Sequence, residues 1–164
     1  MPRTARAQHH AQPSLFDQPQ RITPEQLLQM ARGLMEDPAR DQMTSYHGVL
    51  AYLHLKHGNP RNEVFRVLYL DRKNRLIEDR EMGHGTIDHV PVYPREVIRA
   101  ALLNDACALI LCHNHPSGDP TPSQADLAMT RQIKDACDLM GITLHDHIIV
   151  GTGREHSMRS AGEI

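Results

Sequence analysis

The chain has few of the features that mark exported, membrane or disulfide-linked proteins. Its 164 residues include three cysteines, no tryptophan and only 4% aromatic residues. An odd number of cysteines, without a C-x-x-C pair, favours reduced core thiols in a cytoplasmic protein. The start of the chain has no apolar stretch typical of a signal peptide, and the longest apolar run, residues 106–112, is too short to span a bilayer. We therefore expect a cytoplasmic protein without a membrane segment.

A net excess of charge is also missing. The formal net charge is -2 with neutral histidines, which gives no overall electrostatic argument for nucleic-acid binding. With 40% hydrophobic residues, a chain of this length can bury one good core but hardly a second. We expect a disordered tail over residues 1–20, N-terminal helices over 21–60 and one compact domain over 61–164.

Hydrophobic periodicity predicts helices ahead of the compact domain and an alternation of strands and helices within it. Helices are expected over residues 24–36 and 41–56, and the second is expected to turn Met43, Val49, Leu50 and Leu53 inward. The domain pattern favours an α/β fold with a mixed sheet between helices. Its expected elements are a strand from Glu63, a turn at 71–74, a second strand, a break at Gly83 and Gly85, a third strand ending near Val92, a helix from Pro94, an apolar strand reaching residue 112, a helix from Pro122, a strand over 142–150 and an edge strand over 157–164.

The stretch HNHPSGDPTPSQAD contains the side chains of a hydrolytic metal site. It follows the apolar strand, so His113 and His115 fall at the end of that strand and, because side chains alternate, project to the same face. Two imidazoles and a carboxylate such as Asp126 suit zinc, with a fourth position left for water. Ferrous iron is chemically open as well.

The carboxylate lies on a helix predicted to follow the turn. This helix is predicted to begin at Pro122, with Thr121 as N-cap and Gln124 closing a capping box. On this helix Ser123 and Asp126 are three residues apart and share a face. Zinc would lower the pKa of a bound water to about 7 and polarise a carbonyl. Hydrolysis still needs a carboxylate base for the proton, and spacing alone does not select it.

Other residues compete for these roles. His145 and His147 form a second H-x-H, but no serine and aspartate follow at helical spacing, so we interpret this pair as structural or as a support behind the ligands. Asp119 is closer in sequence to the histidines than Asp126 is, but its place in the turn Ser-Gly-Asp-Pro explains it. The H-x-E and P-C-x-x-C signature of the zinc deaminases is absent.

With these motifs the chain resembles the RadC-like branch of the JAB/MPN superfamily, also called JAMM metallopeptidases. The superfamily pattern of H-x-H, seven residues, serine, two residues and aspartate fits residues 113–126 without a gap. The strings NEVFRVLYLDRKNRLI, GTIDHVPVYPREVIRAAL, HNHPSGDPTPSQAD and DHIIVG are of the RadC-like kind, and the resemblance covers roughly residues 42–164. It implies an α/β/α sandwich with a mixed β-sheet, similar to that of cytidine deaminases.

The resemblance also implies a role for each site residue. One Zn²⁺ per chain would be held by His113, His115 and Asp126. The upstream glutamate of the family pattern falls on Glu63, which implies a general base that holds the attacking water and passes its proton to the leaving amine. Ser123 would stabilise the oxyanion or orient the water.

The function that the resemblance implies is a zinc-dependent hydrolase that cleaves peptide or isopeptide bonds in an unknown peptide or protein substrate. Two alternatives stay open: an accessory role in DNA repair or mobile-element biology without peptidase activity, and a binding scaffold in which zinc is structural. Longer RadC-like proteins carry a helix-hairpin-helix segment ahead of this domain. Its glycine-bearing hairpin is not visible here, which weakens any inherited claim of DNA binding, and the sequence leaves the oligomeric state open.

Overall fold

The computed structural model describes residues 43, 45–57, 61–84 and 92–164 of the chain. These residues form one sheet of five strands: β1 (Val64–Leu70), β2 (Leu76–His84), β3 (Ala108–Asn114), β4 (Thr143–Val150) and β5 (Glu155–Ser157). Their order across the sheet is β2-β1-β3-β4-β5. β1 lies antiparallel to β2 and β3, β3 runs parallel to β4, and β4 pairs antiparallel with β5, so the sheet is mixed.

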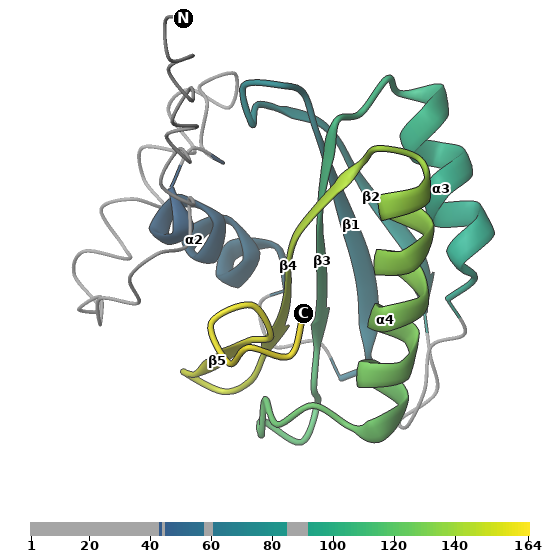
Figure 1. Ribbon diagram of the computed structural model, residues 1–164. Helices are drawn as coiled ribbons and strands as arrows, with labels where there is room; N and C mark the ends of the chain where they lie inside the picture. The colour runs from purple at the N-terminus through teal and green to yellow at the C-terminus, as the bar shows by residue number, and fades with distance from the viewer. Residues whose placement is uncertain (1–42, 44, 58–60, 85–91) are drawn as a thin grey trace, which may run out of the picture.

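Helices cover both faces of this sheet. α2 (Tyr46–His57) lies on one face, while α3 (Pro94–Leu103) and α4 (Gln124–Leu139) lie side by side on the other (Figure 1). α4 is the crossover that joins the parallel strands β3 and β4, as parallel pairing requires. The three layers confirm the predicted α/β/α sandwich with a mixed β-sheet.

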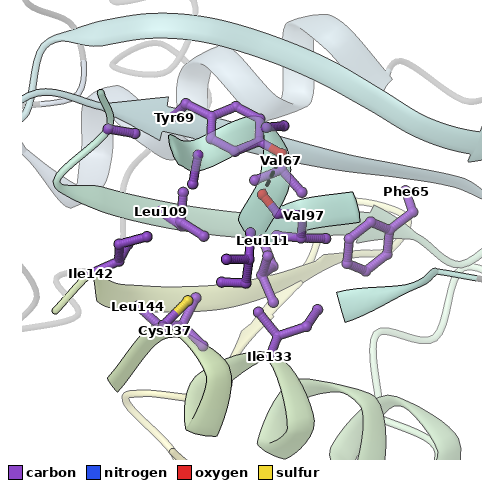
Figure 2. Close-up of a cluster of buried hydrophobic side chains, with 14 residues drawn as sticks. Phe65, Val67, Tyr69, Val97, Leu109, Leu111, Ile133, Cys137, Ile142 and Leu144 are labelled. Carbon is purple, nitrogen blue, oxygen red and sulfur yellow. Dashed lines mark hydrogen bonds between the residues drawn. The ribbon is translucent and has the colours of Figure 1, made fainter. Parts of the chain in front are cut away.

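The core beneath α3 and α4 unites the helices with the sheet. Tyr69, Leu109 and Leu111 from the sheet pack with Val97 of α3 and Ile133 of α4 (Figure 2). The Tyr69 hydroxyl donates a hydrogen bond of 3.4 Å to the Val97 carbonyl, so the polar end of this buried ring has a partner. Removing a fully buried side chain here, as in Leu111→Ala, is expected to cost about 2–5 kcal/mol of unfolding free energy.

A second core joins α2 to the opposite face. The inward-facing residues predicted for this helical segment are all buried, which confirms that part of the prediction. They pack against alternate residues of β1, β3 and β4, because side chains on a strand point to the two faces in turn. The members of this core include Met43, Val49, Leu50, Leu53, Leu68, Ile110 and Ile148.

β3 lies between the two cores, and every one of its residues is buried. A strand covered on both faces reads as a continuous apolar run, which is how residues 108–112 read. Its carboxyl end lies beside the carboxyl end of the parallel strand β4. Open α/β sheets place their ligand sites at such ends.

Two helices begin later than the sequence predicts. α2 begins at Tyr46 rather than at residue 41, because the Ser45 hydroxyl accepts the Gly48 N–H at 3.1 Å in the manner of an N-cap. α4 begins at Gln124 rather than at Pro122, with Ser123 as its N-cap. The pattern of inward-facing residues is correct in α2, but the helix starts are wrong.

The start of α4 depends on a competition between two hydroxyl residues. Thr121 does not cap the helix, because its N–H and its hydroxyl both donate to Asp119 Oδ1, at 3.1 and 2.8 Å. Ser123 accepts the Asp126 N–H, and the Asp126 carboxylate accepts the Ser123 N–H. The capping box therefore closes on Asp126, and the predicted box between Thr121 and Gln124 is wrong.

The structure corrects two predictions about the edge strands β2 and β5. β2 continues through Gly83, which pairs with Phe65, so the predicted break at Gly83 is wrong. One of the two irregularities in this pairing falls at Met82, which is the extra residue between two consecutive pairs, as in a β-bulge. At the other edge, β5 ends at Ser157 and a turn follows, so the predicted strand over 157–164 is also wrong.

The predicted tail over residues 1–20, the predicted helix over 24–36 and Gly85 with the strand predicted after it to residue 91 lie outside the described residues. The proposed domain boundaries therefore stay predictions. Within the part of the chain that the structure describes, no helix combines the length and apolar character needed to cross a membrane.

Candidate metal centre

The two histidines and the aspartate of the motif converge at one point. His113 lies at the carboxyl end of β3, His115 directly follows that strand, and Asp126 lies in the first turn of α4. One donor atom from each residue lies within 4.8 Å of the other two. The two Nε2 atoms are 2.9 Å apart, and Asp126 oxygens lie 3.4 Å from His113 Nε2 and 3.7 Å from His115 Nε2. The structure thus brings together the three residues predicted as ligands.

The loop after β3 fixes the backbone of His115. The His115 N–H donates to the Val150 carbonyl at 2.9 Å, and the His115 carbonyl accepts from the Gly118 N–H at 2.9 Å. Gly118 adopts a positive φ of 82°, and a Cβ there would lie 2.6 Å from the Thr152 hydroxyl oxygen. Glycine is therefore required for the loop after β3 to pack against the loop after β4.

A backbone carbonyl orients the ring of His115. Its Nδ1 lies 2.8 Å from the Asp119 carbonyl oxygen, which can only accept, so Nδ1 carries the hydrogen. The neutral ring then has its lone pair on Nε2, the atom that lies on the side of His113 and Asp126, and the protonated ring can donate from Nε2 to Asp126. Hydrogen bonding to Asp126 raises the pKa of His115, against the opposing effect of burial. The Asp119 carboxylate itself binds Thr121, so Asp119 takes part through its backbone.

Ser123 holds the carboxylate of Asp126. The Ser123 N–H and hydroxyl donate to Asp126 Oδ2 at 2.7 and 2.6 Å. Burial acts to raise the pKa of Asp126, but the hydrogen bond with His115, the electrostatic interaction with the His113 ring and the donors of Ser123 outweigh it and hold the pKa well below its usual range. The carboxylate is therefore ionised, as a metal ligand must be.

His147 lies behind His113 in the protein interior. Its Nε2 is 2.8 Å from His113 Nδ1, and its Nδ1 is 2.6 Å from the Thr130 hydroxyl oxygen. Burial lowers the pKa of His147 to about 3, so this ring is neutral. Phe65 stacks on the His113 ring at an interplanar angle of 18° and meets the His147 ring edge-on at 68°.

The other histidine of the second H-x-H lies outside this group. His145 Nε2 is 2.7 Å from Asn74 Oδ1, at the turn between β1 and β2. Burial, with the nearby charge of Arg159, lowers the pKa of His145. The sequence suggested that both histidines of this pair are structural or supporting. In the structure His147 contacts the proposed ligand His113, whereas His145 binds Asn74 in a turn.

Glu63 lies immediately before β1, and the start of β1 lies beside the end of β3 that carries the histidines. Phe65 pairs with His113, and the antiparallel register continued by two residues places Glu63 opposite His115. After the hydrogen bond to Asp126, the charge of Glu63 is one of the influences that raise the pKa of His115. Glu63 is partly buried. This position suits a general base, and that role stays a prediction.

The three converging donors fit a divalent cation of the zinc type. Zinc in proteins takes imidazole nitrogens and carboxylate oxygens, and both kinds of donor are present. His115 Nε2 carries a lone pair and lies 2.9 Å from His113 Nε2, a distance at which the two rings can share a hydrogen or a cation. The chemistry of the donor set therefore fits a metal.

The fold and the site together define an α/β domain of the JAB type with a candidate metal centre. A model of the RadC-like JAB domain matches residues 43–163, and the chain belongs to this family. A UPF0758 protein of Rhodobacter capsulatus is 58% identical over 123 residues, covering 75% of this chain and 58% of that protein. A UPF0758 protein of Ruegeria pomeroyi is 55% identical over 123 residues, covering 75% of this chain and 55% of that protein. The matched part thus spans little more than half the length of these relatives.

Two polar residues of the site went unnoticed in the sequence. Thr130 is fully buried on α4, one turn after Asp126, and its spacing of four residues was the available signal. Asn114, between the two ligand histidines, is 3% exposed and points to the opposite side from them. Its side chain binds the segment that carries Glu63.

Proposed function

We propose that the protein is a metal-dependent hydrolase with Zn²⁺ held by His113, His115 and Asp126, and that it cleaves peptide or isopeptide bonds. The observation that carries the proposal is the convergence of two Nε2 atoms and a carboxylate within 4.8 Å at the end of the central strand. Three protein ligands leave one coordination position open, which is typical of catalytic rather than structural zinc.

The residues around the centre would divide the work of hydrolysis. Zn²⁺ would polarise a substrate carbonyl and bring the pKa of a water molecule toward neutrality. The Glu63 carboxylate would take the proton of the attacking water and deliver it to the leaving amine. His115 is oriented for its role by the Asp119 carbonyl. Ser123 orients Asp126, and an additional role at the oxyanion stays a prediction.

Membership of the RadC-like JAB family supports hydrolysis, but the peptide or isopeptide substrate comes from the resemblance to JAMM metallopeptidases. Ferrous iron accepts the same donors, so the metal has to be identified by experiment. A scaffold with structural zinc would have no need of a base at Glu63. A substitution of Glu63 therefore distinguishes the enzyme from the scaffold.

The first test is the metal content of the purified protein. Elemental mass spectrometry after exhaustive dialysis should find about one Zn²⁺ per chain, by the three-ligand stoichiometry of such sites. His113→Ala and Asp126→Ala should lose the metal. His145→Ala is the matched control, since it removes a histidine of the other H-x-H and should keep the metal. Bound metal that survives in both ligand variants, or its absence from the wild type, would reject the proposed centre.

The second test separates an enzyme from a scaffold. Peptide and isopeptide substrates are screened with the zinc-loaded wild type, and Glu63→Gln is the comparison because it keeps the shape of the side chain and removes the base. We expect Glu63→Gln to retain zinc and to lose turnover by about 100-fold or more, which is the usual contribution of a general base. Equal turnover in the two proteins would remove Glu63 from the mechanism.

A further inference from the structure

A chain of buried hydrogen bonds joins two of the proposed ligands through the protein interior. His113 Nδ1 lies 2.8 Å from His147 Nε2, and His147 Nδ1 lies 2.6 Å from Thr130 Oγ1. The Thr130 hydroxyl also lies 2.6 Å from the backbone carbonyl oxygen of Asp126. His113, His147 and Thr130 are each 0% exposed, so solvent does not compete for these bonds.

The carbonyl at one end sets the direction of every bond. The Asp126 carbonyl can only accept, so the Thr130 hydroxyl donates its single proton there. Thr130 Oγ1 then offers His147 only a lone pair, and His147 Nδ1 must donate to it. The His147 ring is fully buried and no carboxylate accepts from it, so the ring is neutral and its Nε2 accepts from His113 Nδ1. His113 is left with a lone pair on Nε2.

We propose that Thr130 and His147 are positioning residues that hold His113 as its Nδ1–H tautomer, with the Nε2 lone pair ready for a cation. The inference rests on the proposed metal centre, but it depends neither on hydrolysis nor on the nature of the substrate. Thr130 and His147 act through His113 from the side away from Asp126 Oδ1 and His115. Phe65 holds the two rings in place, with centroid distances of 5.9 Å to His113 and 5.5 Å to His147.

The opposite tautomer would close the site to metal. His113 would carry a hydrogen on Nε2, aimed at His115 Nε2 at 2.9 Å. To reach this state, His147 would have to donate from Nε2, and Thr130 would have to turn its proton from Asp126 to His147. The Thr130 and Asp126 oxygens, 2.6 Å apart, would then face each other with lone pairs only. A buried acceptor left in this way carries a desolvation penalty, so the chain of bonds disfavours the closed state.

Two pairs of variants test the chain through metal affinity. Thr130→Val keeps the shape and removes the hydroxyl, whereas Thr130→Ser keeps the hydroxyl. His147→Leu removes the acceptor, whereas His147→Gln retains a carbonyl oxygen that can accept from His113. Competition with a chromophoric chelator should show the dissociation constant for Zn²⁺ rising about 10- to 100-fold in Thr130→Val and His147→Leu. Thr130→Ser and His147→Gln should remain close to the wild type.

His145→Leu is the matched control for these variants. His145 lies on the same strand, two residues before His147, but its ring binds Asn74 instead of a ligand. Its loss should leave the Zn²⁺ affinity unchanged, and thermal unfolding of all variants shows which are folded. An equal loss of affinity in His145→Leu and His147→Leu would show a general effect on the strand and would overturn the proposal.

Histidine ¹⁵N chemical shifts of the metal-free protein give a readout independent of metal and of activity. In the wild type we expect His113 and His147 both as Nδ1–H tautomers. In Thr130→Val the His147 Nδ1–H loses its acceptor, so both rings should switch to Nε2–H. A residue that merely fills space would leave the tautomers unchanged.

The outcomes separate this inference from the proposed function. His113 observed as the Nε2–H tautomer in the metal-free wild type would overturn the inference, as would unchanged Zn²⁺ affinity in folded Thr130→Val and His147→Leu. If those variants do not fold, the His113 tautomer of the metal-free wild type decides whether the inference holds. A wild type that shows the expected tautomers but binds no Zn²⁺ would reject the proposed metal centre and leave the tautomer assignment supported.

Discussion

The side chain of Asn114 holds the backbone of Val64. Asn114 Oδ1 accepts from the Val64 N–H at 2.9 Å, and its Nδ2 donates to the Asn62 carbonyl at 3.1 Å. One carboxamide on β3 thus binds the residues on both sides of Glu63. In this way the middle residue of the HNH string holds the backbone around the proposed base, while the two histidines on either side of it are proposed ligands.

Asn114→Ala tests this division of roles. We expect the variant to lose about 1–3 kcal/mol of unfolding free energy, because the Val64 N–H and the Asn62 carbonyl lose a buried partner. Zinc content should stay at the wild-type level, while turnover falls because Glu63 is no longer held. Urea unfolding, elemental analysis and kinetics provide the three measurements. Asn104→Ala, which removes an amide bound to Ala100 on α3, is the control and should leave turnover unchanged.

The convergence of the three donor residues could be predicted from the sequence because its determinants are local. Alternation along one strand places His113 and His115 on one face, and a short turn into a helix brings Asp126 back to that strand end. The exact helix start could not be predicted in the same way. Thr121 and Ser123 both suit an N-cap, and the choice depends on whether the Asp119 carboxylate engages Thr121.

The supporting residues depend on pairings between distant parts of the chain. His147 reaches His113 because β3 and β4 pair in parallel with Leu111 opposite His147, a register that periodicity does not encode. Glu63 reaches the site because of the register of β1 on β3, so only the family pattern could select it from the sequence. For the residues that act across the sheet, the sequence therefore left the role of His147 open between structure and support, and Glu63 came from the resemblance.

Ser123→Ala distinguishes support of the ligand from a role at the oxyanion. The Ser123 hydroxyl donates to Asp126 Oδ2 and accepts its N–H, so its removal should cost about 1 kcal/mol of stability as a lost N-cap. We expect Zn²⁺ affinity to fall as well, because Asp126 loses a donor that orients it. Ser123→Thr retains a capping hydroxyl and is the control. Chelator competition that shows full affinity together with a large loss of turnover would favour the oxyanion role instead.

The three thiols should differ in reactivity. Burial raises the pKa of Cys137 to about 11 and the pKa of Cys112 well above its ordinary value, whereas Cys107 is only partly buried. Because the thiolate is the reactive form, a thiol with a pKa about three units above pH 8 is ionised in roughly one molecule in a thousand. Iodoacetamide at pH 8 should therefore modify Cys107 first in the folded protein. Peptide mass spectrometry checks this, and urea-unfolded protein, in which all three should react, is the control.

Asp146 anchors the turn that follows β5. Fully buried, its carboxylate accepts from the Ser157 hydroxyl at 2.5 Å and from the backbone N–H groups of His147 and Arg159 at 2.7 and 2.9 Å. Asp146→Leu leaves both backbone donors unpaired. Because each unpaired donor costs about 1–3 kcal/mol, we expect the free energy of unfolding to fall by about 2–6 kcal/mol. Asp146→Asn should be tolerated, because its oxygen can accept the two N–H groups while its NH₂ donates to Ser157.

The difference in unfolding free energy between Asp146→Asn and the wild type should depend on pH. Burial raises the pKa of Asp146 above its ordinary value of 3.8, and the hydrogen bonds from Ser157 and Arg159 offset this only in part. As pH rises above 3.8, the unfolded carboxyl loses its proton before the folded one does, so the wild type loses stability until the folded group has ionised too. The asparagine variant has no such titration. Urea unfolding of both proteins across this range, with chelator present, should show the variant gaining relative stability as pH rises. An identical pH dependence of the unfolding free energy in both proteins would contradict the assignment.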